Sequence, residues 1–545
     1  MTSHTSRTSN DFLYRVEKLN AIGKALTSVK DTPHLLEIIL QGAKTLTNAD
    51  GGTLYLVTRD RQLSFEFMHT GSLGIRLGGS TRNPVPFRPI PLYDDEGRPN
   101  LRMVAAYAVH HGTTVNMPDV YSSEEFDFSG TQSFDRQTGY LSRSFLTVPM
   151  QNHDAEVIGV LQLINALDRE SGKIVTFSRE DQQLAESLAS QAAIALTNQQ
   201  LINELKNLFE KFIELIARAI DEKSPYTGEH CRRVPELAMM LADAVNEMHE
   251  GPLGDFRLTD EQLYELRIAA MLHDCGKITT PVHIVDKSTK LETIFDRIHL
   301  IDTRYEVLKR DAQIEFLEKR LAISQKEDSA DLDAAEREYR SRLEHLDADR
   351  DFLRKCNIGT EYMDESDRAR VLQIASSPWR APDGEIRPLL TEEEVENLTI
   401  PKGTLTPEER AVISNHIVST INMLEALPFP KHLRGVPEIA GGHHERMDGT
   451  GYPRGLTREQ MSIQARIMGI ADIFEALTAV DRPYKVGMKL SQALEILEQM
   501  KDGAHIDPDL HDVFVEQKVY LDYARRFLQV QQIDGADSAA GGQSG

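Results

Sequence analysis

The sequence predicts a multidomain protein in which an α+β domain is joined by a connecting coiled-coil helix to an all-α domain with an inserted helical hairpin. The chain has 545 residues, which is too long for a single hydrophobic core. Alternating apolar runs typical of strands occur only in the first third, and helical and heptad spacings follow them. A highly charged helical block then interrupts the second half of the chain.

Composition limits the classes of partner. The chain has 61 Lys and Arg against 85 Asp and Glu, a formal net charge of −24, which repels nucleic acid polymers and anionic membranes. The three cysteines show no paired spacing, and no segment approaches the roughly 20 apolar residues of a membrane span. We therefore expect a cytoplasmic protein without disulfides and with neither a nucleic acid nor a membrane partner.

The first domain is predicted over residues 30–180, after an N-terminal segment over residues 1–29. Apolar residues at helical spacing occupy residues 12–48, and short alternating runs come next. Residues 144–150 and 157–164 flank a polar turn and predict a β-hairpin. Helix therefore gives way to strands in this domain.

Residues 181–220 show the heptad pattern of a coiled-coil signalling helix. One seam position recurs at Ala195, Ile202, Phe209 and Ile216, and the other at Asn198, Leu205, Phe212 and Ala219. Such a pattern is typical of a parallel dimer, so a homodimer is expected. The alternative is an amphipathic helix packed on its own domain, because heptad and helical periods are hard to separate over four repeats.

Helical patterns dominate residues 205–530, which we predict to form the second domain. An insert over residues 296–391 has two apolar stripes, which predict two antiparallel helices joined near residues 324–329. The stripes consist of Ile298, Ile301, Tyr305, Leu308 and Ala312, and of Leu332, Ala335, Tyr339, Leu343, Leu346 and Leu353. The Gly-, Ala- and Ser-rich tail over residues 534–545 is predicted to be disordered.

Histidines and aspartates in the helical half favour a site for divalent metal ions. His273 and Asp274 are adjacent, Lys277 follows them, and His443 and His444 form a second pair. Neutral imidazoles and carboxylates suit iron, manganese or zinc, and one carboxylate can bridge two ions through its two oxygens. Two neighbouring histidines after an apolar run are costly to bury without a cation.

Five ordered segments extend this pattern. They are YTGEH at 226–230, HDCGK at 273–277, the LT pair at 405–406 leading to His416, HHERMDGTGYP at 443–453, and ADIFEALT at 471–478 followed by RPYK at 482–485. Together they resemble the HD-GYP family, a branch of the HD-type metal-dependent phosphohydrolases. The resemblance covers roughly residues 205–515. The insert separates His416 from His273 by more residues than in most family members.

The resemblance implies two divalent metal ions, iron or manganese, and hydrolysis of cyclic di-GMP to linear pGpG, GMP or both. By similarity, one ion is held by His230, His273, Asp274 and Asp472, and the other by Asp274, His416, His443 and His444. Some family members bind a third metal, for which Asp221, Glu222 and Glu229 are candidates. The resemblance also assigns Asp274 and Lys277 to catalysis, and Lys277, Arg482, Lys485 and Tyr452 to substrate binding.

Two alternatives remain for the second domain. One is a sibling enzyme on the same scaffold that cleaves cyclic GMP-AMP. The other is a catalytically silent regulator that binds a cyclic dinucleotide or a partner protein. The seven metal-ligand positions and Lys277 are all intact, which argues against silence.

The first domain has its own motifs: NMPDVY at 116–121, TGY at 138–140, EVIGVLQ at 156–162 and NALD at 165–168. These resemble a GAF domain of the cyclic-nucleotide-binding type found in phosphodiesterases and adenylyl cyclases. The resemblance implies control of the catalytic half by cyclic AMP or cyclic GMP, with Asn165 and Asp168 as ligand residues. A structural or dimerising GAF domain without a ligand is the alternative.

Overall fold

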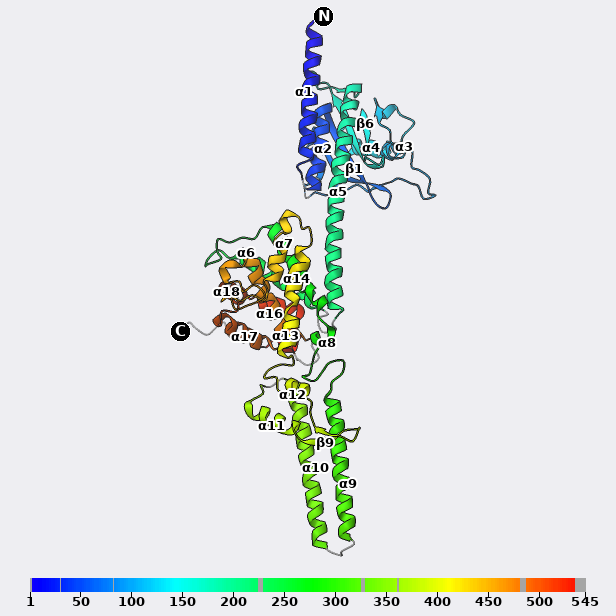
Figure 1. Ribbon diagram of the computed structural model, residues 1–545. Coiled ribbons are helices and arrows are strands. Elements are labelled where there is room, and N and C mark those ends of the chain that lie inside the picture. Colours follow the sequence, from blue (N-terminus) through cyan, green and yellow to red (C-terminus); the bar gives the residue numbers. More distant parts are fainter. Residues whose placement is uncertain are drawn as a thin grey trace. The chain divides into compact units, whose positions relative to one another are not determined.

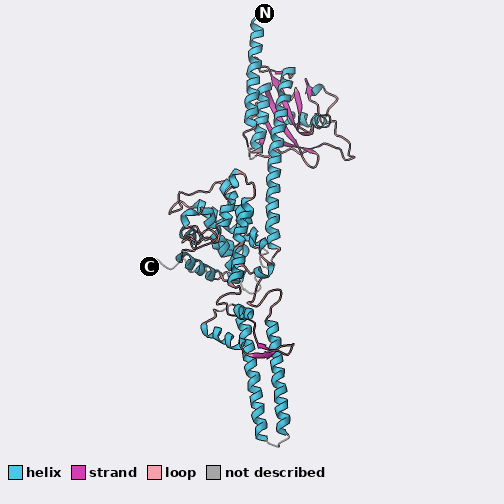
Figure 2. Ribbon diagram, in the orientation of Figure 1, coloured by secondary structure: helices cyan, strands magenta, loops and turns pink. Residues whose placement is uncertain are grey.

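The structure is a computed structural model that describes residues 2–29, 31–81, 83–223, 229–324, 329–359, 362–480 and 487–534. The chain divides into two compact units, Met1–Phe209 and Glu210–Gly545 (Figure 1). The first unit contains a sheet with helices, and the described part of the second is helical apart from one two-stranded ribbon (Figure 2). The predicted combination of an α+β domain with a largely helical domain is confirmed.

The first unit is built on one antiparallel sheet with the strand order β3-β2-β1-β7-β6-β5, in which β4 pairs with β2 and β8 with β7. The predicted hairpin is confirmed as β6 paired with β7. The strands are β1 (Ala49–Val57), β2 (Gln62–Thr70), β3 (Ile75–Gly78), β4 (Ile90–Pro91), β5 (Val115–Met117), β6 (Phe145–Gln151), β7 (Val157–Leu167) and β8 (Ile174–Val175).

Helices cover the sheet. Leucine, isoleucine and alanine side chains of α1 (Thr2–Leu26), α2 (Thr32–Thr47) and the first turns of α5 (Arg179–Asp221) form one core with β1, β6 and β7. Smaller apolar clusters include residues of α3 (Val104–His111) and η1 (Val120–Ser122), and α4 (Ser129–Thr138) begins directly after Phe128 of one of these clusters. Local signals set the ends of α2, because Asp31 caps its first turn and Asn48 ends it in the left-handed conformation, with φ 52°.

Helix α5 runs from the first unit into the second. Beyond the core of the first unit it exposes a stripe of large apolar side chains at alternating spacings of four and three residues, namely Leu201, Leu205, Leu208, Phe212 and Leu215. This stripe shares Leu205 and Phe212 with the predicted seam. Ile202 of the predicted seam is exposed beside this stripe, whereas Phe209 and Ile216 are partly buried and Leu208 and Leu215 are exposed next to them.

The helical core of the second unit is formed by α6, α7, α14, α15 and α16, which pack on one another. Its helices outside the insert are α6 (His230–Glu247), α7 (Asp260–Leu272), η2 (Cys275–Thr279), α8 (Val282–Val285), α13 (Pro407–Ser414), α14 (His416–Glu425), η3 (Lys431–Leu433), α15 (Val436–Gly441), η4 (Arg458–Gln460), α16 (Ile463–Thr478), α17 (Leu490–Asp502), α18 (Pro508–Glu516), α19 (Val519–Phe527) and η5 (Val530–Gln532). Residues 535–545 of the predicted disordered tail lie outside the described residues.

The insert contains α9 (Ile298–Ser324), α10 (Ser329–Ile358), α11 (Glu365–Ala375), β9 (Pro378–Arg380), β10 (Ile386–Pro388) and α12 (Glu392–Leu398). The long helices α9 and α10 pack side by side. The apolar cluster of the insert reaches Leu291 and Leu398, so its core extends beyond the predicted boundaries at 296 and 391.

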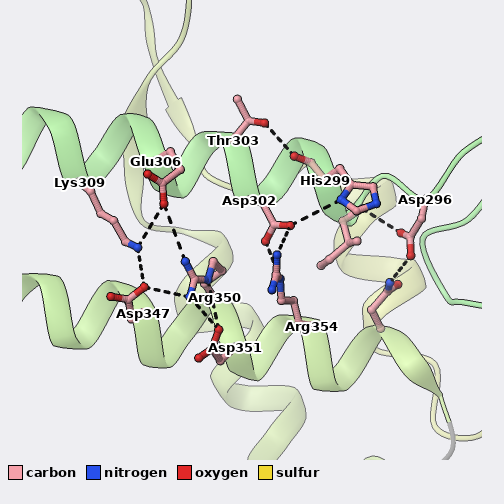
Figure 3. Close-up of polar contacts among 12 residues, drawn as sticks. Asp296, His299, Asp302, Thr303, Glu306, Lys309, Asp347, Arg350, Asp351 and Arg354 are labelled. Carbon is pink, nitrogen blue, oxygen red and sulfur yellow. Dashed lines mark hydrogen bonds and ion pairs between the residues drawn. The ribbon is translucent and has the colours of Figure 1, made fainter.

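Ion pairs join α9 to α10 along the surface of the hairpin (Figure 3). Lys309 Nζ lies 2.5 Å from Asp347 Oδ1, and Arg354 Nη2 lies 2.8 Å from Asp302 Oδ2. Such solvent-exposed pairs each contribute about 1 kcal/mol or less. The hairpin is therefore held mainly by its apolar seam.

No helix among the described residues combines the length and the apolar character that crossing a bilayer requires.

Candidate metal centre

Short helices of the second unit bring the predicted ligands together. His230 and His416 are the first residues of α6 and α14, His273 is the C-cap of α7, and Asp274 is the N-cap of η2. His443 and His444 follow α15, and Asp472 lies within α16. Helix ends from distant parts of the chain therefore converge on one buried point.

Three of the histidines use the same local bond to aim their rings. His273 Nδ1 lies 2.7 Å from the carbonyl of Ala270, and His443 Nδ1 lies 2.6 Å from that of Ala440. His416 Nδ1 approaches the carbonyl three residues before it in the same way. An Nδ1–H that donates to a carbonyl leaves Nε2 free for a metal ion.

Asp274 lies between two groups of ligands. Its Oδ2 is 3.3 Å from Nε2 of both His230 and His273. Its Oδ1 is 3.3 Å from His416 Nε2. The two carboxylate oxygens thus face different histidines, which is the arrangement that a bridging ligand requires.

The ligand atoms form three overlapping groups whose members lie within 4.8 Å of one another: His230 with His273 and Asp472, His416 with His443 and His444, and His273 with Asp274 and His443. His416 Nε2 is buried and makes no hydrogen bond to the described residues. Five imidazoles and two carboxylates with such an orphaned nitrogen fit divalent transition metals. Asp221, Glu222 and Glu229, the candidates for a third metal, belong to none of these groups.

The pKa shifts of the histidines differ between the two sides of the centre. Burial disfavours charge on His230, but hydrogen bonds to Asp274, Asp472 and Glu475 raise its pKa well above the usual range. Burial likewise opposes charge on His273, yet Asp274 and Asp472 raise its pKa to about 9.

On the other side, burial and neighbouring imidazoles lower the pKa of His443 well below its usual range. Burial lowers the pKa of His444 to about 4. Burial also disfavours the charge of Asp274, but Lys277 and His273 hold its pKa well below the usual range. The charged groups are therefore concentrated around Asp274.

Glu475 supports His230 and was not singled out from the sequence. Its Oε2 lies 2.5 Å from His230 Nδ1, and its Oε1 lies 3.0 Å from Arg233 Nε. Glu475 follows Asp472 by three residues in α16, so one helix face supplies both a ligand and the carboxylate that orients another ligand. The signal was present in the ADIFEALT segment, where the three-residue spacing puts both acids on one face.

The Glu445 side chain holds the loop that follows His443 and His444. Its buried carboxylate accepts hydrogen bonds from the backbone N–H groups of Arg454, at 2.7 Å, and Leu456, at 2.9 Å. The Tyr452 ring stacks on the His444 ring with a centroid distance of 4.9 Å. The loop therefore places Tyr452 directly beside the metal ligands.

Lys277 lies within hydrogen-bond distance of the bridging carboxylate, with Nζ 2.6 Å from Asp274 Oδ2. Its ammonium is thus at the centre and not in solvent. The other cations predicted for substrate binding, Arg482 and Lys485, lie outside the described residues.

The first unit contains a cavity of about 210 Å³ lined mainly by aromatic and apolar side chains of β1, β2, α3, α4, β6 and β7. Neither Asn165 nor Asp168 lines it. The Asn165 amide instead accepts from the backbone N–H of Arg143, at 2.7 Å, and Asp168 accepts from the backbone and hydroxyl of Ser171. Both side chains hold the backbone of their own loops.

Comparisons with known proteins agree with this organisation. Residues 31–196 match the family model described as GAF domain, and residues 227–377 and 392–510 match two models described as HD domain. A probable cyclic di-GMP phosphodiesterase of Vibrio cholerae is 36% identical over 141 residues, which are 24% of this chain and 31% of that protein.

Two further relatives are similar over comparable lengths. The 3'3'-cGAMP-specific phosphodiesterase 3 of Vibrio cholerae is 41% identical over 20% of this chain and 22% of that protein. A cyclic di-GMP phosphodiesterase of Thermotoga maritima is 34% identical over 24% of this chain and 35% of that protein. The matches thus span between about a fifth and a third of these relatives' own lengths. The chain therefore combines a GAF domain with a largely helical HD-domain region, and several relatives of that region are named as cyclic di-GMP phosphodiesterases.

Proposed function

We propose that this protein is a metal-dependent phosphodiesterase that hydrolyses cyclic di-GMP to linear pGpG, GMP or both. The observation that carries the proposal is the position of Asp274, whose two oxygens face two separate sets of histidines. Relatives named as cyclic di-GMP phosphodiesterases support the choice of substrate.

Iron or manganese would be held by the seven residues in two groups: His230, His273, Asp274 and Asp472 for one ion, and Asp274, His416, His443 and His444 for the other. Divalent cations at such a centre lower the pKa of water and offset negative charge on phosphate oxygens.

The protein's own groups orient these ligands and bind the substrate. Carbonyl acceptors fix three imidazoles, and Glu475 fixes His230. Lys277 exchanges part of its contact with Asp274 for a phosphate oxygen of the substrate. Tyr452 borders the bound dinucleotide, and Arg482 and Lys485 contact its second phosphate or a guanine.

Turnover by the full chain, purified anaerobically and supplied with iron or manganese, tests this proposal. Linear product from cyclic di-GMP is expected, with a large loss of rate in Lys277→Ala. Faster cleavage of cyclic GMP-AMP would favour the alternative enzyme activity. The similarity to 3'3'-cGAMP-specific phosphodiesterases supports that alternative. Binding of either dinucleotide without hydrolysis in the metal-loaded protein would favour the silent regulator.

We also propose a cytoplasmic homodimer whose GAF domain regulates turnover through α5. The exposed stripe from Leu201 to Leu215 supports the dimer, because five large apolar side chains at heptad spacing form a coiled-coil seam. Sedimentation of the wild type and of Leu205→Glu tests it: the variant should shift towards monomer, and equal mass in both would contradict the seam.

The proposed GAF ligand is cyclic AMP or cyclic GMP. Turnover of cyclic di-GMP should change when one of them is added to the full chain, and a four-residue insertion after Leu205 should uncouple that change by shifting the seam. Failure of both nucleotides to bind would favour a GAF domain without such a ligand.

A further inference from the structure

The last turns of α5 pack inside the second unit, next to the segments that carry the metal ligands. Ile213, Ala217 and Ile220 are buried on the inward face of this part of the helix. The helix ends at Asp221, and Lys223 follows it in a turn whose backbone N–H donates to the carbonyl of Ile220. This end of the helix carries two polar side chains: Lys223, which contacts η2, and Asp221, which contacts the first turn of α6.

Lys223 holds the end of η2. Its Nζ donates to the carbonyls of Lys277, at 2.9 Å, and Thr280, at 2.7 Å, and also to the carbonyl of Ile278. The three N–H groups of an ammonium are thereby matched by three carbonyl acceptors. One side chain from the linker helix therefore fixes the end of the segment that begins at Asp274.

The opposite side of η2 is fixed by α14. The N–H of Gly276 donates to Thr420 Oγ1 at 2.9 Å, and Thr420 Oγ1 donates to the carbonyl of His273 at 3.2 Å. A Cβ at Gly276 would lie 1.9 Å from the carbonyl oxygen of His416. The segment is thus clamped between α14 and Lys223, and Lys277 projects from it to Asp274.

Asp221 makes the second contact of the same helix end. Its carboxylate accepts hydrogen bonds from the backbone N–H and the thiol of Cys231, the residue after His230. The end of α5 thus touches the first turn of α6 as well as η2. A change in this helix end acts on two ligand-bearing segments at once.

We propose that Lys223 is a positioning residue that transmits the placement of α5 to η2 and so sets the position of Lys277 relative to Asp274. Lys223 touches no proposed ligand side chain, so it acts through the backbone of η2. The functional part of this proposal rests on the proposed role of Lys277 in phosphate binding. The mechanical part rests on the hydrogen bonds alone.

The test uses the full chain with three variants. Lys223→Met keeps the length of the side chain and removes all three donors, whereas Lys223→Arg keeps charge and donors. Lys211→Met is the matched control, because Lys211 lies on the same helix and pairs only with the exposed carboxylate of Glu214 in the described structure. Hydrogen exchange of residues 275–281, metal content, and kcat and KM for cyclic di-GMP are measured for each.

Lys223→Met should speed exchange of the η2 amides about tenfold and lower kcat/KM about tenfold at unchanged metal content. Lys223→Arg should recover most of both losses, and Lys211→Met should match the wild type. Unchanged exchange in Lys223→Met would overturn the proposal. Hydrogen exchange is measured without substrate. A wild type that hydrolyses no cyclic dinucleotide would therefore refute the proposed function. The contact of Lys223 with η2 would then be judged by hydrogen exchange alone.

Discussion

The two halves of the candidate metal centre both contain buried histidines, and yet these histidines differ in charge. Burial opposes protonation of His230 and His273 in one half and of His443 and His444 in the other. In the half with His230, His273 and Asp472, carboxylate oxygens lie within 3.2–3.7 Å of the imidazoles, and the pKa values of both histidines rise. In the half with His416, His443 and His444, the pKa values of His443 and His444 fall.

The difference shows that burial alone does not decide the charge of these histidines. Desolvation lowers an imidazole pKa, and an adjacent carboxylate reverses the shift where its attraction exceeds the desolvation cost. His443 and His444 therefore offer neutral imidazoles at neutral pH, while His230 and His273 hold protons until a cation displaces them.

Removing the bridge between the halves should have the largest effect. Asp274→Ala is expected to lose both metal ions and to abolish turnover, because one oxygen faces each group of histidines. Metal analysis and product assays measure both effects. Lys277→Ala is the companion variant, which should keep the metals and lose rate. Full occupancy and activity in Asp274→Ala would refute the binuclear assignment.

The second-largest effect is expected from a substitution that pushes the two halves of the centre apart. Gly276→Val would push a side chain against the backbone of His416 and Thr420, and such overpacking costs about 1–3 kcal/mol of stability. We expect a lower melting temperature together with loss of metal from the histidine-rich half. Gly469→Ala is the control, because its added Cβ meets only an ordinary contact, 3.5 Å from the His443 carbonyl. Equal behaviour of the two variants would contradict the close approach.

The halves should also differ in pH dependence. Below the raised pKa of His273, about 9, a cation entering the carboxylate-rich half must displace protons, so affinity there rises with pH towards that value. His444, with its pKa lowered to about 4, is already neutral, so it should add little pH dependence to metal affinity between about pH 6 and 8.

Calorimetric metal titration in buffers of different ionisation enthalpy counts the protons released for each ion. About one to two protons are expected for the carboxylate-rich half, and fewer for the other half, where His443 and His444 release none. Asp472→Asn and His444→Gln each weaken one half and so assign the two binding events. Equal proton release in both halves would show that the difference in charge does not persist in solution.

The smallest effect is expected from the charged hairpin. Replacing residues 313–342 by a short turn removes exposed pairs such as Lys319 with Glu338, at 2.9 Å, and leaves the apolar cluster around Leu291 and Leu398 intact. Metal content and turnover should stay within about twofold, because exposed pairs are screened by solvent. Replacing the wider range 296–391 should also retain metal, but it exposes that cluster. Loss of metal in the shorter variant would mean that the hairpin helps to build the site.

Local patterns in the sequence were enough for the order of the domains, the long helices and the residue types of the centre. A helix or strand period is a property of neighbouring residues, and paired His and Asp residues keep their chemistry wherever the chain folds. The split of the ligands into two groups around Asp274 followed from family resemblance. Spacing alone says nothing about which distant helix ends meet.

Tertiary structure decided the features that depend on contacts between distant segments. The exposed register of α5 depends on which helix face the domains bury, and the fit of Gly276 depends on the approach of α14. Glu475 and Lys223 gain their roles from His230 and η2, and Asn165 turns inward to hold a loop. Burial and hydrogen-bond partners are set by three-dimensional packing, and no one-dimensional period encodes them.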